Sequence, residues 1–213
     1  MIRSVVFDVG ETLIKDDREW RAWAEWLDVP PHTLSGLVGA VTSAGRDNAE
    51  AFQLIRPGFD LAVERQLREE AGVGERIDES DLYPDVRCAL EALKAAGCWL
   101  GIAGNQTARA ATLLRRLELP VDAIATSGEW DVAKPDARFF RKVVEFAPGA
   151  PDEILYVGDH RDNDVVPSRA AGLRSGLIRR GPLGYLWADD SSVRENADWV
   201  FDSLVELPDL IAS

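Results

Sequence analysis

The sequence predicts an α/β fold in which helices cover both faces of a parallel β-sheet. From residue 83 onward, short apolar runs alternate with helical patterns, and such alternation is typical of βα units. Residues 16–82, in contrast, contain helical patterns and no convincing strand. We therefore expect a three-layer, Rossmann-like core of residues 1–15 and 83–213, with a small α-helical domain of residues 16–82 inserted after the first strand.

The first strand is expected to end at Asp8. β-Branched Val5 and Val6 open an apolar run that continues through Phe7, and Gly10 marks a turn beyond it. Later apolar runs predict five more strands, at residues 99–103, 123–126, 154–157, 175–178 and 199–201. Parallel strands deliver their last residues to one edge of a sheet, which is where open α/β folds place their chemistry.

The helices of the core are expected at residues 84–96, 106–117 and 136–146, with a short helix ending near residue 171. Pro84 suits the first turn of its helix, Gly97 suits the end of the same helix, and Asp136 is a good N-cap. A last helix follows residue 203, and we expect Pro208 to limit it.

Three helices are expected in the insert, at residues 18–27, 32–44 and 59–71. Trp20, Trp23 and Trp26 recur at helical spacing in the first of them. Large apolar side chains on one helix face usually pack in a core, so we expect them to form the interior of the insert or its seam with the main domain.

The chain of 213 residues is acidic, with 24 Lys or Arg, 37 Asp or Glu and a formal net charge of −13. Nucleic acids and anionic membranes would be repelled, and a small anionic substrate would need a local positive site, for which we expect a bound cation with one or two Lys or Arg. Neither a membrane-spanning stretch nor a signal-peptide pattern is present, which favours the cytoplasm. Cys88 and Cys98 lack metal-ligand spacing and are predicted to be two buried thiols. Monomer and homodimer remain open.

Polar side chains follow three of the predicted strands. Asp8 ends the first strand, Asn105 comes just after the second, and Asp159 ends the strand at 154–157. Lys134 precedes Pro135, which favours an extended backbone and therefore a directed side chain. Carboxylate oxygens suit Mg²⁺, and a divalent cation would let an anionic substrate approach an anionic side chain. The sequence therefore predicts a magnesium site at this edge of the sheet.

In these segments the chain resembles the haloacid dehalogenase superfamily, and order, strand context and spacing all agree. The matching residues are Phe7-Asp8-Val9-Gly10-Glu11-Thr12-Leu13, Gly104-Asn105, Lys134-Pro135 and Gly158-Asp159 with Asn163-Asp164. The helical insert falls where that family carries its smaller cap domain. The resemblance implies a hydrolase that uses Mg²⁺ and a covalent intermediate.

The resemblance also assigns roles residue by residue. It implies that Asp8 is the nucleophile and a magnesium ligand. The Gly10 backbone carbonyl and Asp159 would be further ligands, and Asp164 or Asn163 would hold metal-bound water.

The remaining matched positions concern the substrate. Lys134 would neutralise charge on the transferring group and on Asp8. Asn105 would orient the substrate or the nucleophile, and Gly104 would line the same binding site.

Two positions depart from the family pattern. Phosphatases of the family usually carry a second Asp, the general acid–base, where this chain has Gly10, and most members have Ser or Thr where it has Gly104. General acid–base catalysis contributes about 10²–10⁴-fold, so cleavage of an alkyl phosphate should suffer most. Glu11 is the neighbour that could substitute for the missing carboxyl group.

Several functions stay open at this stage. The leading hypothesis is a hydrolase of a small phosphorylated metabolite. Alternatives are a hydrolase whose leaving group needs no proton, such as a 2-haloacid dehalogenase, and a non-catalytic member that keeps the metal site. A phospho-accepting receiver domain also uses Asp, Lys and Mg²⁺, but it is shorter and lacks a helical insert. Taken one by one, the same residues could be a helix cap or a solvated lysine. The sequence does not identify the substrate.

Overall fold

The computed structural model describes residues 1–212, which fall into two compact units. One unit joins residues 1–15 to the chain from residue 78 onward, and the other comprises residues 16–77. The core resumes before the expected residue 83 because the two crossing segments pair with each other. Ile14 forms an antiparallel bridge with Leu82, and the Lys15 amide donates to the Asp81 carbonyl at 2.8 Å.

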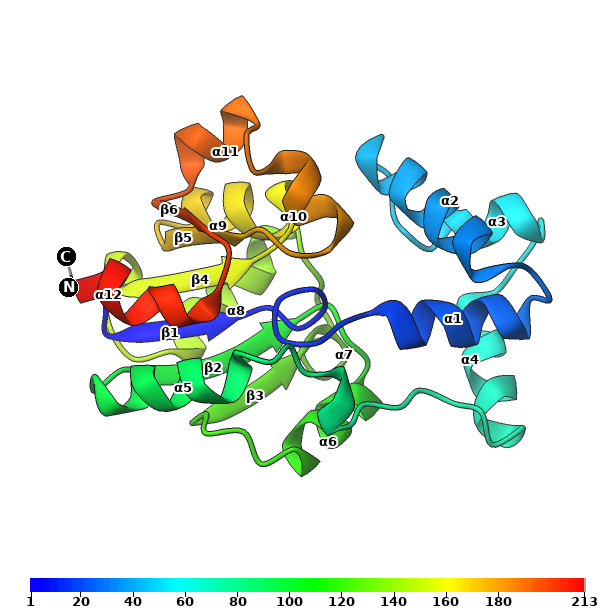
Figure 1. Ribbon diagram of the computed structural model, residues 1–213, viewed down its shortest axis with the longest axis horizontal. Coiled ribbons are helices and arrows are strands. Elements are labelled where there is room, and N and C mark those ends of the chain that lie inside the picture. The colour runs from blue at the N-terminus through cyan, green and yellow to red at the C-terminus, as the bar shows by residue number, and fades with distance from the viewer. Residues whose placement is uncertain (213) are drawn as a thin grey trace. The chain divides into compact units, whose positions relative to one another are not determined.

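The core contains a six-stranded sheet in the order β3-β2-β1-β4-β5-β6, and every pair of neighbouring strands is parallel (Figure 1). The strands are β1 (Ser4–Phe7), β2 (Trp99–Gly104), β3 (Ala123–Thr126), β4 (Ile154–Gly158), β5 (Arg174–Ile178) and β6 (Trp199–Phe201). The predicted α/β fold with a parallel sheet is confirmed.

The register of the sheet brings the carboxyl ends of its central strands together. Phe7, the last residue of β1, pairs with Ile102 of β2 on one side and Val157 of β4 on the other. The next residue, Asp8, donates its amide to the Val157 carbonyl at 2.8 Å. The residues that follow β1, β2 and β4 therefore lie at one edge of the sheet.

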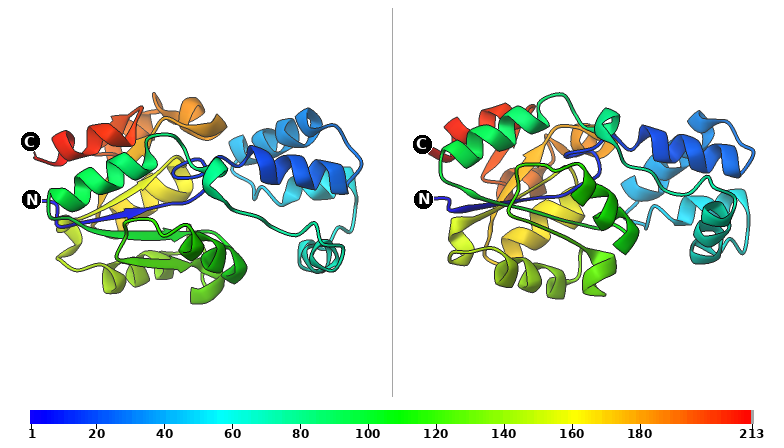
Figure 2. Two further views of the ribbon diagram at one scale, coloured as in Figure 1. Left: turned by 60° about the horizontal axis from the view of Figure 1, so that its bottom comes forward. Right: turned by 90° about the horizontal axis from the view of Figure 1, so that it is seen from below.

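Helices cover both faces of this sheet, as the two views in Figure 2 show. The core helices are α5 (Val86–Ala95), α6 (Ala108–Arg116), α7 (Ser127–Trp130), α8 (Ala137–Phe146), α9 (Val166–Ala170), α10 (Gly181–Trp187), α11 (Ser191–Asn196) and α12 (Leu207–Ala212). Helices α5 and α12 pack together on one face, and α8 covers the other.

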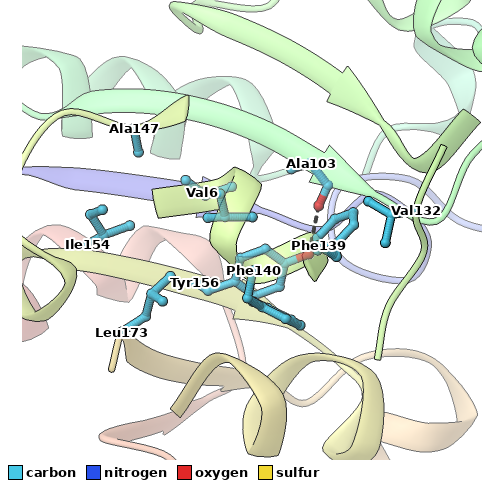
Figure 3. Close-up of a cluster of buried hydrophobic side chains, with 10 residues drawn as sticks. Val6, Ala103, Val132, Phe139, Phe140, Ala147, Ile154, Tyr156 and Leu173 are labelled. Carbon is cyan, nitrogen blue, oxygen red and sulfur yellow. Dashed lines mark hydrogen bonds between the residues drawn. The ribbon is translucent and has the colours of Figure 1, made fainter. Parts of the chain in front are cut away.

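The interior beneath α8 is a cluster of buried apolar side chains (Figure 3). Phe139 and Phe140 of α8 pack against Val6 and Tyr156 of the central strands, and all four are fully buried. Burial of one such side chain stabilises a fold by about 1.5–3 kcal/mol. The Tyr156 hydroxyl donates to the Ala103 carbonyl at 2.6 Å, so the polar end of this ring is satisfied inside the core.

The local signals at helix ends succeed in part. Asp136 caps α8 by accepting the Arg138 amide at 2.8 Å. Pro84 instead lies just before the N-cap of α5. The expectation that Pro208 limits the last helix is wrong, because Pro208 lies in the first turn of α12, where its missing amide hydrogen has no helical acceptor. Cys98 is buried, but Cys88 is exposed on α5, so the prediction of two buried thiols is wrong for Cys88.

The second unit contains helices and no strand among its described residues. Its helices are α1 (Asp17–Trp26), α2 (Pro31–Ser43), α3 (Glu50–Ile55) and α4 (Leu61–Glu70). Trp23 is buried in its interior beside Phe52, while Trp20 and Trp26 are partly buried against the same cluster, as expected for a core of the insert. Helix α3 was not predicted because six residues give too little periodicity to detect.

Across the described residues, no helix combines the length and apolar character needed to cross a membrane.

Candidate functional site

Three carboxylates meet at the carboxyl edge of the sheet. Asp8 directly follows β1, Asp159 directly follows β4, and Asp164 lies in the turn after Asp159. One carboxylate oxygen from each of them falls within 4.8 Å of the others, and all three residues are buried. Buried carboxylates repel one another, so this arrangement needs nearby positive charge.

Lys134 supplies part of that charge. Its Nζ lies 2.6 Å from Asp8 Oδ1 and 2.6 Å from Asp164 Oδ1. Burial by itself would lower the pKa of the Lys134 ammonium, but the Asp164 and Asp8 carboxylates raise it well above its ordinary value, so the group stays charged. Burial raises the pKa of the Asp8 carboxyl, a rise that Lys134 opposes and Asp164 reinforces.

The Asn105 amide holds the Lys134 backbone in place. Asn105 Nδ2 donates to the Lys134 carbonyl at 2.9 Å, and Asn105 Oδ1 accepts the Lys134 amide at 2.8 Å. This paired contact ties the segment before α8 to the end of β2. Asn105 therefore acts on the site through Lys134 in this structure.

Asp164 is presented by a single π-helical turn, Arg161–Val165, which His160 caps. His160 Nδ1 accepts the amides of Asp162 and Asn163 at 3.1 and 3.2 Å. The His160 amide in turn donates to Asp164 Oδ2 at 2.9 Å. Because Nδ1 acts as an acceptor, the imidazole is neutral; burial lowers the pKa of His160 to about 4, and the Lys134 charge contributes.

Gly104 leaves room for the Asp8 carboxylate. A β-carbon at position 104 would lie 2.5 Å from Asp8 Oδ1 and 3.1 Å from a methyl group of Val9. The side chain that most family members carry at this position would therefore collide with the Asp8 carboxylate as it sits here. The position of the Asp8 carboxylate against Lys134 therefore depends on the absence of a side chain at Gly104.

The loop after β1 begins with a tight turn. Leu13 and Ile14 both donate their amides to the Val9 carbonyl, at 2.9 and 3.0 Å, and Gly10 lies inside this turn. Glu11 adopts a left-handed backbone with φ of 49°. For a residue with a β-carbon this conformation costs about 1–2 kcal/mol, so surrounding contacts must hold it. One such contact is a hydrogen bond from the Tyr83 hydroxyl to Glu11 Oε2.

The structure thus brings together most of the residues that the sequence singles out. The side chains of Asp8, Lys134, Asp159 and Asp164 form one buried cluster. The remaining three predicted positions, Asn105, Gly104 and Gly10, border this cluster through the Lys134 backbone, the Asp8 carboxylate and the Asp8 loop.

Sequence reasoning missed the supporting roles of His160, Tyr83 and Arg180, although His160 next to Asp159 and the segment of Arg180 after a strand could be placed near the site. His160 does carry a signal, because a polar side chain just before an acidic turn is a possible cap. The contacts of Tyr83 and Arg180 with the Asp8 loop carry no such signal, because these residues approach it from distant parts of the chain.

The cluster fits a divalent cation by charge and by ligand chemistry. The cluster combines three carboxylates with the Lys134 ammonium, which contacts two of them, and this leaves an excess of about two negative charges when all are ionised. Hard carboxylate oxygens are the ligands that Mg²⁺ prefers in proteins.

Comparison with known proteins places this geometry in context. A profile of the haloacid dehalogenase-like hydrolase family matches residues 2–172. Glyceraldehyde 3-phosphate phosphatase of Methanocaldococcus jannaschii is 31% identical over 132 residues, which are 61% of this chain and 56% of that protein. Phosphoglycolate phosphatase of Chromobacterium violaceum is 28% identical over 228 residues, covering 99% of this chain and 96% of that protein. The chain thus spans only about half of the first of these relatives.

Solved structures share the fold. A predicted phosphoglycolate phosphatase from Haemophilus somnus superposes with a TM-score of 0.68 at 17% identity, covering 99% of this chain and 98% of that one. L-2-haloacid dehalogenase from Xanthobacter autotrophicus, with chloropropionic acid covalently bound, also gives a TM-score of 0.68, at 20% identity and with 100% and 99% coverage. At these identities the likeness concerns the fold alone.

Proposed function

Because the chain belongs to the haloacid dehalogenase-like hydrolase family, we propose that it is a Mg²⁺-dependent hydrolase of a small phosphorylated metabolite, with Asp8 as its nucleophile. The observation that carries this proposal is the contact of Asp8 Oδ1 with Lys134 Nζ at 2.6 Å inside a cluster of three carboxylates. Relatives named as phosphatases of small phosphorylated metabolites support the choice of substrate class.

In the proposed reaction, an Asp8 oxygen attacks the substrate phosphorus while the bond from phosphorus to the leaving oxygen breaks. The leaving oxygen takes the bonding electrons, and Asp8 becomes an aspartyl-phosphate. Water then attacks the phosphorus, which releases phosphate and restores the Asp8 carboxylate. Lys134 lies next to Asp8 and offsets the negative charge that accumulates there.

Asp8, Asp159 and Asp164 would hold Mg²⁺, with the Gly10 carbonyl as a further ligand. The bound cation supplies charge neutralisation for the phosphoryl oxygens. Without it, an anionic substrate would meet excess negative charge at the cluster.

Gly10 leaves the leaving oxygen without a protein proton donor at the usual position. An alkoxide is a poor leaving group unless it is protonated, whereas an aryl oxide or acyl oxide leaves readily. We therefore propose that the enzyme favours substrates whose leaving group is a weak base.

The test compares p-nitrophenyl phosphate with an alkyl phosphate, using wild type and Gly10→Asp in Mg²⁺. We expect wild type to hydrolyse the aryl ester far faster. Gly10→Asp should accelerate the alkyl ester by about 10²-fold and the aryl ester much less. Equal weak rates on both esters, unchanged by the substitution, would contradict the account of the missing acid.

Two further measurements separate the alternatives. Beryllium fluoride with Mg²⁺ should bind wild type and fail to bind Asp8→Asn; if wild type does not bind it, the nucleophile assignment is wrong. Release of halide from a 2-haloacid, at a rate above that of phosphate release from any ester, would identify a dehalogenase instead.

A further inference from the structure

We propose that Glu11 is a positioning residue that binds Tyr83 and, together with the Arg180 contact to Thr12, fixes the loop that carries Asp8, and that Glu11 does not replace the missing general acid. The inference rests on the proposed function, since it concerns the reaction at Asp8. Glu11 is the residue next to Gly10, so its role determines whether a neighbouring carboxyl group can take part in proton transfer.

The side chain of Glu11 is already engaged within the core unit. Its carboxylate accepts the Tyr83 hydroxyl, and its methylene carbons pack where a β-carbon on Gly181 would lie, at 2.6–2.7 Å from that position. Burial, and then the hydrogen bond to Glu11, raise the pKa of Tyr83, so the phenol keeps its proton and remains a donor. Glu11 is thus held as an acceptor that faces Tyr83.

Arg180 binds the neighbouring residue of the same loop. Its guanidinium donates to the Thr12 carbonyl at 2.8 Å and lies 4.3 Å from the centroid of the Tyr83 ring. The residue is buried, and it follows β5, far along the chain from β1. Two successive residues of the Asp8 loop are therefore held by two groups that also contact each other.

The far end of this arrangement is anchored at Asp85. The Asp85 carboxylate pairs with Arg180 and accepts the Ser203 hydroxyl and the Leu204 amide. Because these contacts hold the Asp85 carboxylate in place, they also fix the position of the Arg180 guanidinium. We call the set Glu11, Tyr83, Arg180 and Asp85 the loop clamp.

The backbone at Glu11 explains why a clamp is needed. A residue with a β-carbon persists at positive φ only where its surroundings hold it there. Glycine would adopt this φ without strain, so the side chain must contribute something that glycine lacks. Placement of Asp8, three residues earlier, against its reaction partner is the contribution that the geometry supports, since misplacement by about 1 Å can cost about 10²-fold in rate.

The experiment measures kcat, KM and the pH profile for p-nitrophenyl phosphate, together with the urea midpoint, for Glu11→Gln, Glu11→Gly and Tyr83→Phe. Gln keeps an oxygen that accepts from Tyr83, so Glu11→Gln should stay within about threefold of wild type with an unchanged pH profile. Glu11→Gly and Tyr83→Phe should each lower kcat by about 10-fold or more with little change in KM. The Glu11→Gly protein should remain folded, because glycine relieves the backbone strain.

Asp122→Ala is the control for a loss of stability alone. Asp122 accepts the Leu100 amide and pairs with Lys94 at the opposite edge of the sheet. The Asp122→Ala substitution should lower the urea midpoint and leave kcat unchanged.

Three results would overturn the clamp. Glu11→Gln as slow as Glu11→Gly, with a changed pH profile, would assign proton transfer to Glu11. Wild-type kcat in Glu11→Gly would remove its role altogether. Strictly additive shifts of the urea midpoint in Glu11→Gly/Tyr83→Phe would show that the pair does not interact. That last measurement needs no turnover, so it tests the clamp even if wild type is no more active than Asp8→Asn, a result that would instead refute the proposed function.

Discussion

The two sides of the site differ in what they offer a substrate. The side built by Lys134, Asp159 and Asp164 is crowded with buried charge. Gly10 and Gly104, in contrast, contribute no side chain of their own, and at Gly104 the Asp8 carboxylate occupies the space that a side chain would take. Under the proposed function the difference separates two tasks: the positive charge that would neutralise the reaction at Asp8 is present, whereas the position expected to deliver a proton to the leaving group is glycine.

The largest expected effect comes from the residue that both sides share. Asp8→Asn should lower turnover of p-nitrophenyl phosphate by about 10³-fold or more, because removal of a nucleophile abolishes the covalent route. The fold should survive, since the substitution removes one of three clustered negative charges. Steady-state kinetics and circular dichroism check both statements. A folded variant with more than a tenth of wild-type activity would assign the chemistry elsewhere.

The next effect tests the charged side alone. Lys134→Met should destabilise the protein by about 3–5 kcal/mol, because it leaves buried carboxylates without their partner. The double variant Asp8→Asn/Lys134→Met should recover part of this loss. Urea unfolding at pH 7 measures both.

Lys94→Met is the matched control for Lys134→Met. The Lys94 pair with Asp122 is about as short, at 2.8 Å, but Lys94 is 38% exposed. Its loss should cost less than about 1 kcal/mol. Equal costs for the two lysines would mean that the buried cluster is not electrostatically coupled.

The sequence could predict the charged side because strand ends in a parallel sheet share an edge. Asp8 and Asp159 each end an apolar run, so their meeting required only the correct fold. Asn105 and Lys134 were also found, but the contact of the Asn105 side chain with the Lys134 backbone was not, because it depends on how the segment before α8 crosses the end of β2.

The supports of the site were beyond prediction for a different reason. Tyr83 and Arg180 reach the Asp8 loop from segments 72 and 168 residues away along the chain. Nothing in local periodicity reports a contact of that kind. The short helices α3, α7, α10 and α11 were missed for lack of length, since four to seven residues do not establish a helical period.

A smaller effect is expected at Gly104. Gly104→Ala should lower stability by about 1–3 kcal/mol and slow turnover, because the new methyl group forces the Asp8 carboxylate away from Lys134. In an Asp8→Ala background the same substitution should cost much less, since the colliding oxygen is gone. Urea midpoints of the four proteins give the coupling. Additive costs would show that Gly104 and the Asp8 carboxylate do not compete for the same space.

The smallest effect concerns the support of Asp164 on the charged side. His160 is neutral in the fold, with its pKa lowered from 6.5 to about 4, first by burial and then by the Lys134 charge. Between these values the unfolded chain binds the proton and the folded protein does not. The contribution of His160 to the free energy of unfolding is therefore complete above pH 6.5 and is lost as the pH falls toward 4. At 1.36 kcal/mol per pH unit, about 2 kcal/mol should be lost between pH 7 and pH 5.

His160→Asn keeps a cap acceptor without titrating, so its metal-free protein should lose about 2 kcal/mol less over this range when urea unfolding is measured in EDTA. His32→Asn, at an exposed position of α2, should behave as wild type. If His160→Asn shows the full wild-type loss, the imidazole does not hold the turn through its neutral Nδ1.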